Sequence, residues 1–304
     1  MTSATHRFGW AALVGPPNAG KSSLMNSLLG QKLAIVTAKP QTTRNRLSGI
    51  LTAPGLQVAF LDTPGLNPRP GRMNRFLNES AKAALADSDA VVVVLDAARL
   101  LDRPKALEAD LATLARPVIE AGRPVLVALN KVDLVRDKAR LLPLMQALSA
   151  RFPGAPLLPV SARRAEGLDA LLSEVAARLP EGPPLFPADQ LSTAPLRFLA
   201  AEIIREKLFV HLSQELPYAT AVEIDLFEEG PEATHIAATV YVGREGHKPM
   251  VIGRGGQMLK TIGSEARAEL VELLESKVRL DLFVKVREGW TEDQGFLRSL
   301  GFGE

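Results

Sequence analysis

Residues 15–22 read Gly15-Pro16-Pro17-Asn18-Ala19-Gly20-Lys21-Ser22. They match the pattern G-x-x-x-x-G-K-[ST] and separate a strand-like segment, Arg7–Val14, from a helix-like segment, Ser22–Leu29. Glycines in such a loop let backbone N–H groups close around phosphate oxygens, and the start of the helix adds positive potential. Lys21 can reach the β- and γ-phosphates, and Ser22 can bind Mg²⁺. In this context the pattern predicts a nucleotide phosphate site rather than a plain glycine turn.

The first half of the chain alternates short apolar runs with helix-like stretches. The runs are Leu56–Leu61, Ala90–Leu95 and Val125–Leu129. Runs of about 4–8 such residues between helices are typical of buried parallel strands. Helices are predicted at Met73–Ala86 and Pro104–Ala121. We therefore expect an α/β domain with a mostly parallel sheet over residues 1–180.

A base-reading motif, Asn130-Lys131-Val132-Asp133, directly follows one of these predicted strands. A carboxylate can accept hydrogen bonds from both N1–H and N2–H₂ of guanine, and adenine offers no such pair of donors. Asn130 can brace the site, and the stem of Lys131 can cover the face of the base. Alone, the motif could be a polar turn. Together with the phosphate loop, it predicts a guanine nucleotide site.

The pattern resembles the translation-factor-like GTPases, and three further motifs fit that family. Asp62-Thr63-Pro64-Gly65 resembles the D-x-x-G element, which implies that Asp62 holds Mg²⁺ through water and that the Gly65 N–H senses the γ-phosphate. Ser161-Ala162 resembles the loop whose backbone contacts guanine O6. Gln41-Thr42-Thr43-Arg44 resembles the threonine element of switch I. We favour Thr43 as the Mg²⁺ ligand, although the sequence leaves Thr42 open.

The residue after D-x-x-G departs from the Ras pattern. Ras-like GTPases position the attacking water with a glutamine there, whereas this chain has Leu66, whose alkyl chain cannot orient water. Either intrinsic hydrolysis is slow or another group orients the water. Asn18 suggests a resemblance to the potassium-assisted GTPases, in which K⁺ bridges phosphates. The alternative, that Asn18 only shapes the loop, stays open.

The resemblance implies a complete set of residues for GTP or GDP and for Mg²⁺. The catalytic residues are Lys21, Thr43, Gly65 and Asn18. The nucleotide contacts are Gly15, Pro16, Pro17, Asn18, Ala19, Gly20, Lys21, Ser22, Ser23, Asp62, Gly65, Asn130, Lys131, Asp133, Ser161 and Ala162. The Mg²⁺ ligands are Ser22, Thr43 and Asp62.

A second domain is predicted after a proline-rich segment. Five prolines lie between positions 180 and 195, which indicates a linker at 181–195. Residues 196–304 then have an α+β pattern. Helices are expected at Leu196–Leu212 and Gln257–Glu275, strands at Ala219–Phe227, His235–Val242 and Val278–Val286, and a further short strand ending with Met250–Ile252.

The second domain contains the turn Gly253-Arg254-Gly255-Gly256. In KH modules a G-x-x-G loop clamps a single-stranded backbone. The run from Val251 to Gly263 closely resembles a KH core, and the order of elements resembles a type II KH fold. The predicted RNA contacts are Lys248, Ile252, Gly253, Arg254, Gly255, Gly256 and Lys260. Ile252, Leu259 and Ile262 can also be core residues, and for Leu259 and Ile262 we favour that interpretation.

Both domains together, with Glu215-Leu216-Pro217-Tyr218 and the C-terminal tail, resemble the bacterial Era family over nearly the whole chain. The resemblance implies GTP hydrolysis, binding near the 3′ end of small-subunit ribosomal RNA, and a role in maturation of the small ribosomal subunit. It also implies peripheral contact of a cytoplasmic protein with the inner membrane, and we expect a monomer. The runner-up is the tRNA-modification GTPase family, but that family usually carries a reactive cysteine. A non-catalytic RNA-binding scaffold is the third alternative.

Composition agrees with a globular protein, but the net charge is misleading. The 304 residues include no cysteine, which excludes disulfides, zinc–thiolate sites and thiol nucleophiles. No apolar run approaches the roughly 20 residues of a membrane-spanning helix.

The net charge of +2 conceals two halves of opposite charge. Residues 1–185 carry 23 basic and 15 acidic residues, whereas residues 186–304 carry 13 basic and 19 acidic residues. We therefore expect a narrow basic RNA footprint near the G-x-x-G turn.

Overall fold

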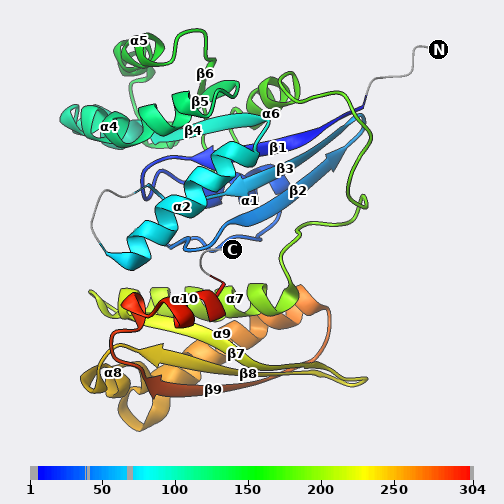
Figure 1. Cartoon of the computed structure of the whole chain (residues 1–304), viewed down its shortest axis with the longest axis vertical. Coiled ribbons are helices and arrows are strands. Elements are labelled where there is room, and N and C mark those ends of the chain that lie inside the picture. Colours follow the sequence, from blue (N-terminus) through cyan, green and yellow to red (C-terminus); the bar gives the residue numbers. More distant parts are fainter. Residues whose placement is uncertain (1–5, 38, 40–41, 67–70, 302–304) are drawn as a thin grey trace. The chain divides into compact units, whose positions relative to one another are not determined.

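The computed structural model of the chain describes residues 6–37, 39, 42–66 and 71–301 (Figure 1). Gln41 of the predicted switch I element and both ends of the chain lie outside these residues. The chain divides into two compact units. The first consists of Met1–Ala34, Thr43–Pro70 and Asn74–Thr193, and the second of Ile35–Thr42, Gly71–Met73 and Ala194–Glu304.

The first unit is built on a six-stranded sheet in the order β2-β3-β1-β4-β5-β6. Its strands are β1 (Arg7–Val14), β2 (Leu47–Ala53), β3 (Leu56–Asp62), β4 (Ala90–Asp96), β5 (Val125–Asn130) and β6 (Leu157–Pro159). Only β2, at the edge, runs antiparallel to its neighbour β3. The predicted mostly parallel α/β fold is confirmed.

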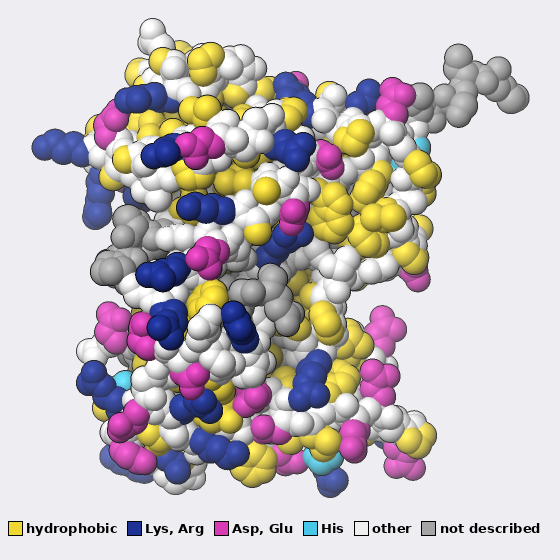
Figure 2. Space-filling model, in the orientation of Figure 1, with side chains coloured by type: hydrophobic (Ala, Val, Ile, Leu, Met, Phe, Trp, Pro, Cys, Tyr) yellow, Lys and Arg dark blue, Asp and Glu magenta, His cyan; other side chains and the backbone are white. Residues whose placement is uncertain are grey.

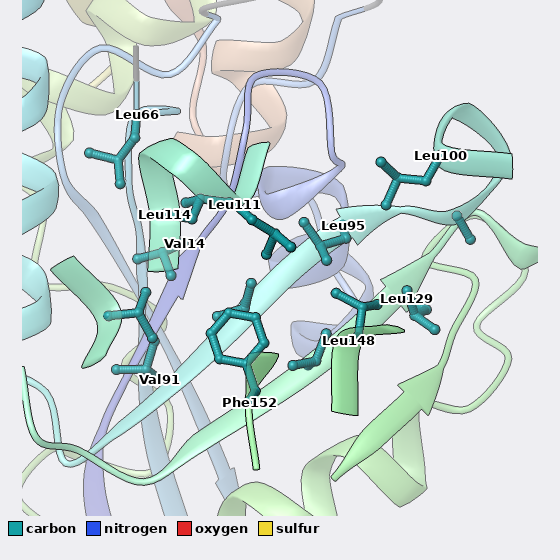
Figure 3. Close-up of a cluster of buried hydrophobic side chains, with 14 of the residues drawn as sticks. Val14, Leu66, Val91, Leu95, Leu100, Leu111, Leu114, Leu129, Leu148 and Phe152 are labelled. Carbon is teal, nitrogen blue, oxygen red and sulfur yellow. The ribbon is translucent and has the colours of Figure 1, made fainter. Parts of the chain in front are cut away.

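Helices pack against this sheet. They are α1 (Lys21–Leu29), α2 (Arg72–Asp87), α3 (Ala97–Asp102), α4 (Lys105–Glu120), α5 (Leu141–Arg151) and α6 (Leu168–Ala176), with short 3-10 helices η1 (Val132–Leu134) and η2 (Lys138–Arg140). Every residue of the valine-rich strand β4 is buried, as expected for a central strand covered on both faces. Figure 3 shows part of the resulting core, in which side chains of β1, β4 and β5 meet those of α4 and α5.

The proline-rich segment is hydrogen-bonded to strands β2 and β3 of this sheet. The buried side chain of Gln57 on β3 accepts hydrogen bonds from the N–H groups of Leu185 and Phe186, at 2.8 and 2.9 Å, and donates to the Phe186 carbonyl at 2.9 Å. Ile50 of β2 donates to the Leu191 carbonyl at 2.8 Å. The compact first unit accordingly extends to Thr193.

The second unit contains α7 (Leu196–His211), η3 (Leu216–Ala219), β7 (Thr220–Glu229), β8 (Thr234–Val242), η4 (Glu245–His247), α8 (Lys248–Ile252), η5 (Arg254–Gly256), α9 (Gln257–Leu274), β9 (Val278–Val286), η6 (Trp290–Glu292) and α10 (Gln294–Ser299). Strand β8 is central, antiparallel to β7 and parallel to β9. Apolar side chains of α7, α8 and α9 pack against this sheet to form the core. The order helix, strand, strand, helix, helix, strand is the predicted type II KH arrangement.

The prediction of a short strand that ends with Met250–Ile252 is wrong. These residues form the end of helix α8, which begins at Lys248 with Pro249 in its first turn, where a missing N–H is tolerated. Val251 is fully buried whereas Met250 is 61% exposed. A three-residue apolar run is too short for its periodicity to separate strand from helix.

No helix in the described part of the chain is long and apolar enough to cross a bilayer.

The Gln57 contacts predict that this side chain stabilises the first unit. Gln57→Leu preserves approximate volume but leaves the N–H groups of Leu185 and Phe186 without their acceptor. We expect the free energy of unfolding, measured by urea titration, to fall by about 1–3 kcal/mol. The matched control is the same substitution at the exposed Gln31, which should change it by less than about 0.5 kcal/mol. Equal effects of the two substitutions would contradict the role of Gln57.

Candidate functional sites

The phosphate loop joins β1 to α1 in a conformation that depends on its glycines. A Cβ atom added at Gly15 would lie 2.2 Å from the Val94 carbonyl oxygen, and one at Gly20 would lie 2.3 Å from Nδ2 of Asn130. Gly20 also has a φ of 93°, and Asn18 has a φ of 61°. Asparagine is one of the few residues with a side chain that adopts this region readily. The loop therefore presents its backbone at the N-terminus of α1, where an anion is favoured.

Lys21 is the first residue of α1, and its side chain turns back into the loop. Its Nζ donates to the carbonyls of Gly15 and Pro16, each at 3.1 Å. The residue is only 6% exposed. Burial lowers the pKa of Lys21 from 10.5 to about 8, against the opposing effect of the Asp62 carboxylate. A bound phosphate would further favour the protonated form of this amine.

Three side-chain oxygen atoms that could bind a metal ion lie close together, from Ser22, Thr43 and Asp62. Ser22 Oγ donates to Asp62 Oδ2 at 2.6 Å and lies 2.9 Å from Thr43 Oγ1, which is itself 3.2 Å from Asp62 Oδ2. Mg²⁺ prefers oxygen ligands at about 2.1 Å in octahedral geometry, so that adjacent ligands lie about 3 Å apart. The spacing of the Ser22 and Thr43 hydroxyl groups fits two adjacent Mg²⁺ ligands, and the Asp62 carboxylate beside them fits a contact through water.

Thr42 and Thr43 point to different surroundings, although the sequence left the choice between them open. Thr42 Oγ1 donates to the Lys39 carbonyl at 2.8 Å and lies 2.9 Å from Thr37 Oγ1. Thr43 instead joins the cluster with Ser22 and Asp62. The geometry therefore favours Thr43 as the metal ligand.

Asn130 connects the base-reading motif to two other loops. Its Nδ2 donates to the Ala19 carbonyl, and its Oδ1 accepts from the Ala162 N–H, both at 3.0 Å. The residue is 1% exposed, at the end of β5. The phosphate loop, the N-K-x-D motif and the Ser161-Ala162 loop, which are far apart in the sequence, are thus held together by one side chain.

Asp133 and Lys131 are held by further contacts. Ser161 Oγ donates to Asp133 Oδ1 at 2.7 Å, which fixes the carboxylate that would read guanine. Lys131 Nζ donates to the Asn18 carbonyl at 2.6 Å and to Asp96 Oδ2 at 2.7 Å.

The sequence did not predict Asp96 as a residue of the nucleotide site. Its position directly after the valine-rich run of β4 could have indicated this role, because the carboxyl ends of parallel strands meet at one edge of the sheet.

The D-x-x-G element lies against the phosphate loop. Thr63 is fully buried and donates to the Leu13 carbonyl of β1 at 2.8 Å. A Cβ atom at Gly65 would lie 2.7 Å from the Pro17 nitrogen, so only glycine permits this approach. Leu66 is 7% exposed and belongs to the apolar core (Figure 3). This burial agrees with the expectation that Leu66 does not orient water.

Pro16, Pro17 and Ser23 complete the predicted nucleotide set. Pro16 lies in the phosphate loop, where its carbonyl accepts from Lys21. Pro17 is in contact range of the D-x-x-G glycine. Ser23 lies in the first turn of α1 and is half-buried.

The G-x-x-G turn of the second unit joins α8 to α9. Gly253, Gly255 and Gly256 have φ values of 77°, 59° and 78°, which favour glycine at all three positions. The turn is closed by the Gly256 N–H, which donates to the Gly253 carbonyl at 3.1 Å. A Cβ atom at Gly253 would lie 2.6 Å from Cβ of Met258, whereas no described atom lies within 4 Å of one added at Gly255.

The predicted RNA contacts surround this turn. Arg254 and Lys260 are exposed, and Lys248 and Ile252 are half-buried, so all four remain accessible. Ile262 is fully buried and Leu259 packs against the core, which agrees with the preferred interpretation of both residues. Basic side chains also lie on the face of the second unit seen in Figure 2. The turn thus presents backbone at the start of an 18-residue helix, with basic groups on either side in the sequence.

Family comparisons agree with both sites. Residues 11–131 match a family described as "50S ribosome-binding GTPase", and residues 215–291 match the KH domain family. The fold and the sites therefore define a P-loop GTPase that carries a C-terminal KH domain, an enzyme that hydrolyses GTP.

Full-length relatives show which family within this class the chain belongs to. The chain is 52% identical to a GTPase Era of Nitratidesulfovibrio vulgaris (strain DP4), covering 99% of this chain and 98% of the relative, and 44% identical to one of Pseudomonas putida (strain KT2440), covering 98% and 97%. The chain belongs to the Era family.

Solved structures of the same family agree in fold over almost the whole chain. One is a variant of Aquifex aeolicus Era bound to GDP.AlF4⁻, and another is Era in complex with MgGDPNP and nucleotides 1506–1542 of 16S ribosomal RNA. Each matches at 36% identity and a TM-score of 0.92, covering 98% of this chain and 100% of its own. The full-length match to Era GTPases and the KH domain disagree with the tRNA-modification family, and the match to a GTPase family disagrees with a non-catalytic RNA-binding scaffold.

The contacts of Asp133 predict a change of nucleotide specificity. Asp133→Asn keeps an oxygen that can accept from Ser161 but removes the carboxylate that reads two donors of guanine. We expect GDP affinity, measured by competition with a fluorescent nucleotide, to fall about 10- to 100-fold while xanthosine diphosphate becomes the preferred ligand. Asp137→Asn, the same change at a residue that caps η2, should leave both affinities unchanged. Unaltered GDP affinity in Asp133→Asn would contradict the role in base recognition.

Proposed function

We propose that this protein is a GTP-driven switch that binds small-subunit ribosomal RNA near its 3′ end and acts in assembly of the small ribosomal subunit. The observation that carries the proposal is the glycine turn at the start of α9. Its three positive-φ glycines leave backbone open to an approaching phosphate, in a chain that also has the full set of GTPase motifs. The 16S ribosomal RNA fragment bound by Era in the similar solved complex supports the same partner.

Hydrolysis of GTP to GDP and phosphate follows from the arrangement of the first unit. The backbone of the phosphate loop and the Lys21 ammonium group would bind the β- and γ-phosphates and stabilise the charge that develops on them. Ser22 and Thr43 would hold Mg²⁺, with Asp62 acting through water. Mg²⁺ would neutralise charge on the phosphate oxygens. The Gly65 N–H would contact the γ-phosphate and so link switch II to the nucleotide state.

The attacking water needs a group other than Leu66, which is buried in the core. We propose K⁺ bound beside Asn18 as an aid to charge stabilisation. The positive φ of Asn18 places its side chain in a turn that exposes the backbone, next to the residue whose carbonyl Asn130 holds. Without such an aid, hydrolysis should be slow.

The remaining family properties are proposals of the same kind. We propose a cytoplasmic monomer whose membrane contact is peripheral. We also propose that RNA binding depends on a local basic surface, formed by Lys248, Arg254 and Lys260, in a half of the chain that is acidic on average.

Potassium dependence tests the role of Asn18. At equal ionic strength we expect GTP hydrolysis in KCl to exceed that in NaCl by at least about tenfold, because a bridging cation acts in the manner of an arginine finger. Asn18→Gly retains the backbone conformation but removes the side chain, and it should abolish the difference. Equal wild-type rates in the two salts would exclude potassium assistance.

A matched pair of substitutions tests the RNA clamp. Both Gly255→Asp and Gly255→Asn tolerate the left-handed backbone and have room for a side chain, but only aspartate adds negative charge. We expect Gly255→Asp to bind an oligonucleotide with the small-subunit 3′ sequence about tenfold more weakly than Gly255→Asn, which corresponds to roughly 1.4 kcal/mol. Both should bind GDP as the wild type does. Equal RNA affinities would reject phosphate approach at this turn.

The proposed partner itself is tested by crosslinking in cells. RNA bound to the wild-type protein and to Gly255→Asp would be crosslinked, recovered and sequenced. Fragments from the 3′ end of small-subunit ribosomal RNA should dominate for the wild type and be depleted for Gly255→Asp. Enrichment of other RNA alone would overturn the proposal.

A further inference from the structure

The first unit has a pocket of about 460 Å³ at the end of the sheet opposite to the nucleotide site. It opens where β5 begins, at Val125, whereas the base-reading Asn130 ends the same strand. Its wall is completed by the C-terminal turn of α4 and by the segment that follows α5. None of the residues assigned to the GTP site or the G-x-x-G turn lines it.

Three arginines from separate segments line this pocket, which has no acidic lining residue among those described. Arg123 precedes β5 and donates to the neutral backbone carbonyl of Ala86 at 2.9 Å. Arg151 and Arg178 pair with Glu108 and Glu174, which lie outside the lining. The side chains of Arg151 and Glu108 are 54% and 71% exposed, so that ion pair contributes little and can be exchanged. The three arginines and their two glutamate partners together leave one positive charge beside the pocket.

The floor of the pocket is apolar and is fixed by the fold. Val118 is fully buried and Phe152 is 4% exposed, and both belong to the core of the first unit. The Phe152 N–H donates to the Leu148 carbonyl at 2.9 Å, and the Ala155 N–H donates to the Phe152 carbonyl at 3.1 Å. At the rim, Ile119 is 61% exposed, although the leucines of the same helix pack inward. Ile119 thus adds exposed apolar surface beside the pocket.

We propose that this pocket docks an acidic peptide segment of a partner protein, with one apolar side chain on the floor and carboxylates on Arg123 and, in exchange for Glu108, on Arg151. A guanidinium group binds carboxylates in a bidentate geometry, and a pocket that receives an apolar anchor within a charged rim is the usual form of such an interface. The positive charge of the half of the chain that carries the pocket favours the same partner.

The character of the floor favours a peptide over nucleic acid. Single-stranded RNA binds to platforms of exposed aromatic rings along a basic groove. Phe152 is the one aromatic residue among the described lining residues, and it is almost fully buried. The other apolar lining residues are aliphatic, which suits leucine or isoleucine better than a base.

Fluorescence anisotropy of the full chain, saturated with GDP, tests the proposal. The probe is a short fluorescein-labelled peptide in which leucines alternate with pairs of aspartate or glutamate. We expect saturable binding that weakens with added salt, and about tenfold weaker binding to Arg123→Glu. Lys105→Glu is the matched control, because it makes the same charge change at the opposite end of α4. It should bind the peptide as the wild type does.

Two further probes separate the apolar anchor from charge alone. A peptide with serine in place of leucine should bind at least about tenfold more weakly, because it lacks the side chain that fills the floor. A peptide with lysine in place of the acids should prefer Arg123→Glu to the wild type. Unchanged GDP affinity in each variant would show that the nucleotide site is intact.

The proposal is overturned by any of three results. These are absence of saturable binding of the leucine peptide, equal binding of the leucine and serine peptides, and equal effects of Arg123→Glu and Lys105→Glu. Oligouridine that binds the wild type more tightly than the peptide does, and loses this binding in Arg123→Glu, would assign the pocket to RNA instead.

Discussion

The hydrogen bonds of Asn130 are the constraint on which the nucleotide site depends. One amide group donates to the phosphate loop at Ala19 and accepts from the Ala162 loop, so two segments far apart in the sequence are set by a single side chain at the end of β5. The contact requires Gly20, because a Cβ atom there would occupy the position of Asn130 Nδ2. The N-K-x-D motif and the phosphate loop are therefore linked by packing within the protein itself, and such fixed geometry reduces the cost of ordering on binding.

The G-x-x-G turn of the second unit has a similar backbone arrangement in an unrelated fold. In both units a glycine with positive φ precedes a helix, so that backbone and the positive end of the helix face outward. The glycines of the two turns are constrained in two ways. Gly15, Gly20 and Gly253 are closed in by neighbouring atoms, whereas Gly255 and Gly256 have positive φ and open space where a Cβ atom would lie. The turn of the second unit therefore combines one closely packed glycine with two that leave room for an approaching group.

The distribution of charge places basic groups locally at each of the proposed sites of an almost neutral chain. The first half is basic and the second half acidic, but neither average describes its sites. Lys21 is buried with a pKa lowered to about 8, and a bound phosphate would further favour its charged form. Arg254 and Lys260 are exposed groups in the acidic half. The arginines around the pocket at the start of β5 belong to the basic half and surround an apolar floor. Local geometry, rather than net charge, decides each site.

The sequence by itself determined the parallel strands and the KH order of elements, and it predicted a GTP site from its motifs, because valine runs and glycine motifs act through local backbone preferences. It did not reveal α8, whose three apolar residues are too few to show a period, or Asp96, whose partner Lys131 follows the next strand. Only the tertiary structure placed Thr43, and not Thr42, beside Ser22 and Asp62, and only it placed the proline-rich segment on Gln57 and brought three arginines around one pocket. Each of these depends on contacts between residues distant in the chain, and no local propensity encodes such contacts.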